Sequence, residues 1–196
     1  MIDYINEKFK ESIQIQITAA ETLPNEIAKA TTLIVSSLLQ GGKIISCGAG
    51  VSTSNAIDFS ALLNSSFNTE RPSLPSVALS SDVVNLTNIA FNYGLDEIFS
   101  QQVKAIANKE DILIAICSDG NTNAISNAIA AALKKDLKII ALTGNDGGVV
   151  AGLLGEQDLE MRIPSQNIVR VKEMQLFALN CIIELVEQQL FPIHKD

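Results

Sequence analysis

Lys43-Ile44-Ile45-Ser46-Cys47-Gly48-Ala49-Gly50-Val51-Ser52-Thr53-Ser54-Asn55 is an apolar run that ends in glycines and hydroxyl residues. A second stretch repeats this design and reads Ile112-Leu113-Ile114-Ala115-Ile116-Cys117-Ser118-Asp119-Gly120-Asn121-Thr122-Asn123. Each predicts a buried parallel strand that leads through a polar loop into the N-terminus of a helix. Backbone N–H groups and the helix dipole then converge on one spot, which favours an anion such as a phosphate ester. Two such loops predict one small-molecule crevice at the carboxyl ends of the strands.

The rest of the chain alternates between the two periodicities. Strands are expected at 43–47, 76–79, 111–116, 138–142 and, as an edge strand, 158–162. Helical patterns cover 52–64, 82–91, 95–107, 122–134 and 167–190, and Gly144, Gly147 and Gly148 mark a turn-rich loop. Strands separated by helices of this length predict an α/β fold with a doubly wound parallel sheet of five strands. No linker interrupts residues 1–196, so we expect one domain.

Two further helices are expected before the first strand. Residues 3–22 carry apolar side chains at helical spacing, Pro24 opens the second helix, and Gly41-Gly42 closes it. A nucleotide-binding type of sheet does not need them. Their apolar faces predict either oligomer packing or an extra layer on one face of the sheet, with neither favoured.

Composition excludes several classes of function. The 196-residue chain has a net charge of −8, which argues against direct contact with nucleic-acid phosphates. No apolar stretch is long enough for a bilayer. The first residues lack the basic region, apolar run and cleavage site of a signal peptide, so we expect none. Cys47, Cys117 and Cys181 lie in apolar contexts, which is typical of reduced thiols in a cytoplasmic protein. The single histidine, His194, rules out a zinc site built on several histidines of one chain.

Known nucleotide motifs are absent from the loops. Thr53 occupies the third glycine position of a dinucleotide fingerprint, and no phosphate-binding loop of the NTPase type is present. The hydroxyl residues of both loops are equally consistent with ordinary helix caps.

Four collinear stretches carry a resemblance to a known family. They are Cys47-Gly48-Ala49-Gly50-Val51-Ser52, Glu70-Arg71-Pro72-Ser73-Leu74-Pro75, Ala141-Leu142-Thr143-Gly144-Asn145-Asp146-Gly147-Gly148, and Val171-Lys172-Glu173-Met174-Gln175. Over essentially its full length the chain resembles the sugar isomerase (SIS) domain family, and within it the phosphoheptose isomerases and their non-catalytic relatives. The resemblance implies a flavodoxin-like sheet and a homotetramer in which the N-terminal helices help to build the subunit contacts.

The departures from the isomerase pattern bear directly on catalysis. Where the isomerases carry a metal-binding histidine and an acid/base glutamate on the helix after the first loop, this chain has Asp58 and Leu62. On the final helix the family's glutamine ligand and second acid/base histidine correspond to Lys172 and Asn180. Leucine has no proton to exchange and asparagine does not titrate near neutral pH. We therefore expect no catalytic residues, and no metal at Asp58, Leu62, Lys172 and Asn180.

The resemblance assigns phosphate binding to Ser52, Ser118, Asp119 and Thr122. Asp119 replaces a hydroxyl donor of the family and Ala49 replaces an asparagine, so the cradle is impaired. A carboxylate about 4 Å from a phosphate charge costs about 4 kcal/mol at an effective dielectric near 20. That cost applies if Asp119 points into the crevice, and is avoided if it turns outward or caps the helix.

Four charged residues suggest a different use of the same crevice. If Asp58, Asp119, Lys172 and Glu173 surround it, a carboxylate pair could bind a cation or act as acid and base. We favour the simpler interpretation, in which Asp58 and Lys172 form an ion pair in a site that has lost its activity.

The end of the last helix points to a protein partner. Leu190 and Phe191 begin a Leu-Phe-Pro ending that the non-catalytic relatives share, where the pair is implicated in tetramer assembly and in contact with the replication initiator DnaA. The ordinary alternative is that they pack the helix end against its own domain. The resemblance thus implies a cofactor-free protein that binds DnaA and promotes its assembly at the origin.

Two other functions stay open. One is D-sedoheptulose 7-phosphate isomerase, a zinc-dependent enzyme of lipopolysaccharide heptose biosynthesis. The other is a sensor that binds a sugar phosphate without turnover.

Overall fold

The computed structural model describes residues 1–68 and 70–192. Its centre is a parallel sheet in the order β2-β1-β3-β4-β5, which is the flavodoxin-like order. The strands are β1 (Ile44–Gly48), β2 (Ser76–Ala78), β3 (Ile112–Ile116), β4 (Lys138–Gly144) and β5 (Leu159–Ile163). The register places Ile44 opposite both Ser76 and Ile112. The predicted five-stranded parallel sheet, with 158–162 at one edge, is confirmed.

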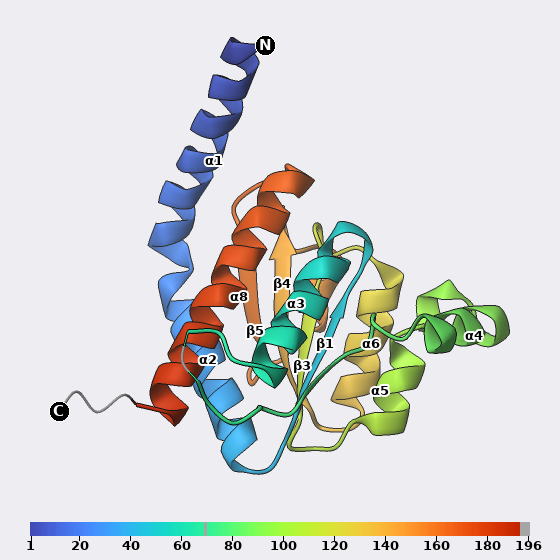
Figure 1. The fold of residues 1–196 in the computed structure, drawn as a ribbon. Coiled ribbons are helices and arrows are strands. Elements are labelled where there is room, and N and C mark those ends of the chain that lie inside the picture. The colour runs from blue at the N-terminus through green and yellow to red at the C-terminus, as the bar shows by residue number, and fades with distance from the viewer. Residues whose placement is uncertain (69, 193–196) are drawn as a thin grey trace.

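Alternate residues of the central strand β3 enter two separate cores. Ile112, Ile114 and Ile116 of β3 face the helices α2 (Pro24–Leu39), α3 (Thr53–Asn64) and α8 (Ile168–Leu190). Leu113 and Ala115 face α5 (Ser100–Ile106), α6 (Asn123–Leu133) and α7 (Gly148–Leu153). All five residues of β3 are buried, because helices cover both faces of the sheet (Figure 1).

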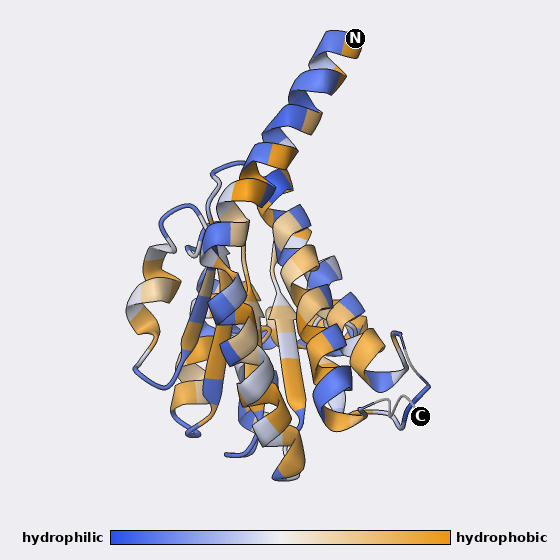
Figure 2. Cartoon of the chain, turned by 90° about the vertical axis from the view of Figure 1, so that its left-hand side faces the viewer, coloured by the Kyte–Doolittle hydropathy of each residue, from blue (hydrophilic) through white to orange (hydrophobic). Residues whose placement is uncertain are grey.

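The two N-terminal helices have different roles. α2 buries Ile27, Ala30 and Ile34 and adds a layer beside α8. α1 (Ile2–Thr22), which lies wholly within the described residues, buries Ala19 alone. Its first turns project beyond the rest of the domain (Figure 1), and apolar and polar residues alternate along it (Figure 2). Of the two alternatives above, the extra layer is formed by α2, whereas oligomer packing through the exposed apolar face of α1 stays a prediction.

One prediction of local structure is wrong, and one short helix was not predicted. The pattern over 95–107 is not one helix: α4 (Val83–Tyr93) ends at Gly94, whose φ is 94°, and a 3₁₀ turn, η2 (Leu95–Glu97), precedes α5. The turn-rich loop after β4 contains the short helix α7. The side-chain oxygen of Asn121 accepts the Val149 N–H at 3.3 Å, so α7 is capped from a distant loop and leaves no local sequence signal.

The cysteines follow the expected burial with one exception. Cys47 and Cys117 are buried, whereas Cys181 is half-buried beside α1 and α2. Burial raises the pKa of the Cys117 thiol to about 12 and raises the pKa of Cys47 above its ordinary range. Both buried thiols are therefore protonated at neutral pH and unreactive.

Candidate functional site

The two predicted loops leave neighbouring strands at the same edge of the sheet. Gly48 of β1 lies opposite Ile116 of β3, and the Ala49 N–H donates to the Ile116 carbonyl at 3.3 Å. The first loop passes through the 3₁₀ turn η1 (Gly50–Ser52) into α3, and the second leads into α6. The sheet order therefore places both helix N-termini at one carboxyl edge, as the sequence predicts.

Ser52 is fully buried and bonded to the last helix. Its hydroxyl donates to Gln175 Oε1 at 3.3 Å, and Gln175 Nε2 donates to the carbonyls of Cys117 at 2.8 Å and Leu142 at 3.2 Å. Gln175 thus fastens α8 to the ends of β3 and β4. Reasoning from the sequence gave it no separate role, although it falls on the apolar stripe of α8 between Val171 and Ala178, where a buried amide needs partners.

Asp119 turns toward its own loop. Its side chain is exposed, and Oδ1 accepts the Asn121 N–H at 3.0 Å. The carboxylate therefore turns outward, as one of the alternatives above expects, and closes a turn within its own loop without capping α6. The full repulsion of an inward carboxylate does not apply to this orientation. The same contact uses an N–H donor that an anion would otherwise engage.

The second loop is held by its backbone against the loop after β4. Gly120 has a φ of 77°, and a Cβ there would lie 1.9 Å from the Gly147 carbonyl oxygen. Any other residue would push the two loops apart. Thr122 occupies the N-cap position of α6 with no side-chain cap bond, and Ser118 is half-buried at the end of β3. Binding of phosphate by Ser52, Ser118, Asp119 and Thr122 stays a prediction.

The positions of the isomerase machinery lie on α3 and α8. Asp58 is exposed, whereas Leu62, Lys172 and Asn180 are half-buried. Leu62 packs against the apolar core. Leucine offers no donor atom, and protonated lysine offers no lone pair, so this set does not fit a zinc ion. Within residues 1–68 and 70–192, no group of three or more His, Cys, Asp or Glu side chains could hold a metal.

The expected ion pair between Asp58 and Lys172 is not formed among the described residues. Asp58 lies on the face of α3 opposite the buried Ala56 and Phe59, and so points to solvent. Nor do the four charged residues share one crevice. Glu173 faces α1, where it lies 2.8 Å from Arg170 and accepts from the Ser12 hydroxyl at 3.5 Å. That prediction is wrong because the helical period places Glu173 and Gln175 on different faces of α8.

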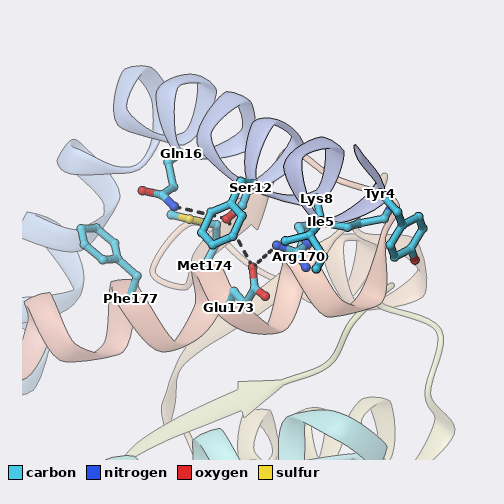
Figure 3. A pocket seen from close by; sticks show the side chains of 10 residues that line it. Tyr4, Ile5, Lys8, Ser12, Gln16, Arg170, Glu173, Met174 and Phe177 are labelled. Carbon is cyan, nitrogen blue, oxygen red and sulfur yellow. Dashed lines mark hydrogen bonds and ion pairs between the residues drawn. The ribbon is translucent and has the colours of Figure 1, made fainter. Parts of the chain in front are cut away.

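The cleft between α1 and α8 has a volume of about 550 Å³. Figure 3 shows it lined from α1 by Tyr4, Ile5, Lys8, Ser12 and Gln16, and from α8 by Arg170, Glu173, Met174 and Phe177. Several large apolar side chains remain exposed along it: Phe9 is 64% exposed and Phe177 is 57% exposed. A single chain therefore leaves this apolar cleft open to water.

The end of α8 is tied to the loop after α3. Glu187 is buried, accepts the N–H groups of Phe67 at 2.9 Å and Asn68 at 3.0 Å, and pairs with Arg71 at 2.7 Å. Burial acts to raise the pKa of Glu187, but these N–H donors and the Arg71 guanidinium outweigh it and hold the pKa below its ordinary value. Leu190 and Phe191 follow, each half-buried against the core. His194 lies outside the described residues.

These features define a class of protein. The model of the SIS domain matches residues 8–144, and the chain belongs to this family. Its fold matches a phosphoheptose isomerase from Francisella tularensis with a TM-score of 0.93 and 38% identity, covering 95% of this chain and 98% of that one. A phosphoheptose isomerase from Neisseria gonorrhoeae matches with a TM-score of 0.90 and 32% identity over the same shares.

Within the family, the chain is similar over its whole length to proteins named DnaA initiator-associating protein DiaA. It is 48% identical to that of Yersinia enterocolitica and 49% identical to that of Citrobacter koseri, in each case over 196 residues and the full length of both chains. Among the described residues no helix is both long and apolar enough to cross a membrane.

Proposed function

We propose that this chain is a DiaA-like protein that binds the replication initiator DnaA and promotes its assembly at the origin, and that it has no isomerase activity. The observation that carries the proposal is the similarity of the complete chain to the DiaA proteins. It includes the end of α8, where Phe191 is partly exposed and therefore accessible to a partner. Reduced, buried thiols suit the cytoplasm, where we place this role.

The chemistry of the site supports a role without turnover. Aldose–ketose isomerisation moves a proton between adjacent carbons, which requires groups that exchange protons near neutral pH. Leu62 is an apolar side chain packed on the core, and Asn180 does not titrate. Gln175, which could offer an oxygen, already has three hydrogen bonds to the protein.

The open cleft supports assembly into a homotetramer. Ile5, Phe9, Ile13 and Ile17 recur at helical spacing on α1 and are between 42% and 64% exposed. A second copy that covered this stripe and Phe177 would remove a large apolar area from water. Four copies would present four initiator-binding tails, which raises effective concentration without requiring each contact to be tight.

A sugar-phosphate role is the second candidate, and the similarity to the two phosphoheptose isomerase structures favours it. The N-termini of α3 and α6 meet at one edge of the sheet, where an anion is stabilised whether or not turnover follows. Binding without catalysis would make the chain a sensor. Catalysis would require zinc and acid/base groups other than Leu62 and Asn180.

One experiment separates these functions. Purified chain, with and without added zinc, is assayed for conversion of sedoheptulose 7-phosphate, and the same preparation is tested for retention of DnaA. The proposal expects retention of DnaA and no turnover. Turnover in the presence of zinc would establish an isomerase. If the chain neither retains DnaA nor converts sedoheptulose 7-phosphate, but binds this sugar phosphate, it is a sensor.

A further inference from the structure

Helix α4 presents an unusually apolar outer surface. Val84 is 78% exposed and Phe91 is 90% exposed, and Val83, Tyr93 and Leu95 are also exposed. All of α4 lies within the described residues, and Ile89 is its one buried residue. Its remaining exposed residues are polar, so α4 shows apolar side chains within a polar surface. Large apolar side chains gathered on an exposed helix often mark a site of interaction. Figure 1 shows α4 at the opposite side of the molecule from α1, so it is separate from the α1–α8 cleft.

Two of the exposed apolar side chains share one face of α4. Val84 and Phe91 are seven residues apart, which places them on the same face two turns from each other. With Asp82, Asn85, Thr87 and Asn88 they line a shallow groove along the helix. We call this groove, together with Val83, Tyr93 and Leu95, the α4 surface. A shallow groove with apolar side chains at Val84 and Phe91 and polar groups between them fits an amphipathic peptide segment.

The charge around the α4 surface selects the occupant. Asp82, Asp96 and Glu97 are the charged residues of the segment 72–103, and Lys104, which follows it, pairs with Glu97 at 3.5 Å. Asp82 and Asp96 are therefore the acidic residues of this segment that have no basic partner among the described residues. Both are exposed: Asp82 caps the start of α4, and Asp96 lies in η2 just after its end, where it accepts from the Asn123 side chain at 3.1 Å. Nucleic acid and anionic lipid would be repelled. A second copy that used the same face would bring like charges together, which is also unfavourable.

We propose that the α4 surface binds a cationic amphipathic segment of another protein. Phe91 is the anchor because an exposed aromatic side chain gains most from burial at an interface. Asp82 and Asp96 pair with basic residues of the incoming segment and set its orientation. This surface lies apart from Leu190 and Phe191, so the inference does not depend on the function proposed for the end of α8.

The test uses a labelled helical peptide of leucine and lysine, about 16 residues long, since shorter helices are marginal in water. Its affinity for the full chain is measured by fluorescence anisotropy, and a photo-crosslinking residue in the peptide reports the site by mass spectrometry. We expect crosslinks within residues 82–96. We also expect affinity to fall as NaCl rises from about 0.05 to 0.5 M, because exposed charge pairs are screened.

Variants make the test specific. Phe91→Ser should lower the affinity for the peptide by at least about tenfold. Phe177→Ser, the same change in the α1–α8 cleft, should leave this affinity unchanged. Asp82→Asn with Asp96→Asn should reduce both affinity and salt dependence, while asparagine keeps the helix cap at 82. The proposal is overturned if the peptide fails to bind, if it crosslinks elsewhere, or if Phe91→Ser has no effect. A changed oligomeric state in Phe91→Ser would overturn it too, because the surface would then belong to a second copy.

Discussion

Arg71 and Glu187 are 116 positions apart in the sequence, yet Arg71 Nε lies 2.7 Å from Glu187 Oε1 with both side chains buried. The same guanidinium donates to the carbonyls of Leu62 at 2.9 Å and Leu63 at 3.0 Å, at the end of α3. Glu187 lies one turn before Leu190 and Phe191. The pair therefore fixes the end of α8, and with it the tail that we propose contacts DnaA.

Breaking this pair should destabilise the fold strongly. Arg71→Ala or Glu187→Ala leaves one buried charge without its partner, which typically costs about 3–5 kcal/mol. Chemical denaturation measures the change in the free energy of unfolding. Lys29→Ala, which removes a surface pair with Glu26, should change it by less than about 0.5 kcal/mol. Equal effects of the buried and exposed changes would contradict this account.

The same pair predicts a loss of stability in acid. The pKa of Glu187 is lowered in the folded state from an ordinary value of 4.5. As pH falls below 4.5, the unfolded chain takes up this proton first, so the free energy of unfolding decreases until the folded pKa is passed. Glu187→Gln should flatten this part of the pH profile, and Glu184→Gln, an exposed change one turn earlier, should not. A profile that is the same in both variants would exclude Glu187 as the titrating group.

Asp119→Ser should strengthen the binding of sedoheptulose 7-phosphate. The change removes a negative charge from the loop and releases the Asn121 N–H from Oδ1. The gain should be about fivefold, since exposed charge interactions are worth about 1 kcal/mol or less. Isothermal calorimetry measures it. Asp146→Ser is the matched control, because Asp146 Oδ1 accepts the Gly148 N–H at 3.1 Å in the next loop. If the affinity rises equally in both variants, the effect comes from the overall charge, and the loop of Asp119 does not form the phosphate site.

Charge on the α1 stripe should prevent assembly. Phe9→Glu with Ile13→Glu places carboxylates in the surface that we propose is shared between copies, while the sheet and its helices are untouched. Sedimentation velocity should show smaller species with an unchanged circular dichroism spectrum. Val149→Glu, at an exposed position of α7, should remain a tetramer. If the α1 variant has the same mass in solution as the parent, the subunit interface does not include the stripe on α1.

The fold could be predicted from strong local sequence patterns, whereas contacts between residues far apart in the sequence could not. The runs at 44–48 and 112–116 are buried throughout because helices cover both faces of the sheet, and they are mostly apolar, so their strands could be predicted directly. Arg71 and Glu187 gave no such signal. In the sequence each resembles a surface charge, and they become buried partners only because the loop after α3 packs against α8. The charged residues on α3 and α8 misled for a related reason: spacing along a helix gives its faces, but not which face meets the crevice.

The measurement that tests the central claim most directly is the affinity of immobilised DnaA for this chain and its Phe191→Ala variant, by surface plasmon resonance with mass determined in parallel. The parent should bind, and Phe191→Ala should bind about thirtyfold more weakly as an intact tetramer, which is the cost of about 2 kcal/mol typical of one aromatic anchor. Leu190→Ala should instead disturb assembly, and Phe177→Ala should still bind DnaA. If Phe191→Ala binds DnaA as well as the parent does, or if the parent does not bind DnaA at all, the proposed function is contradicted.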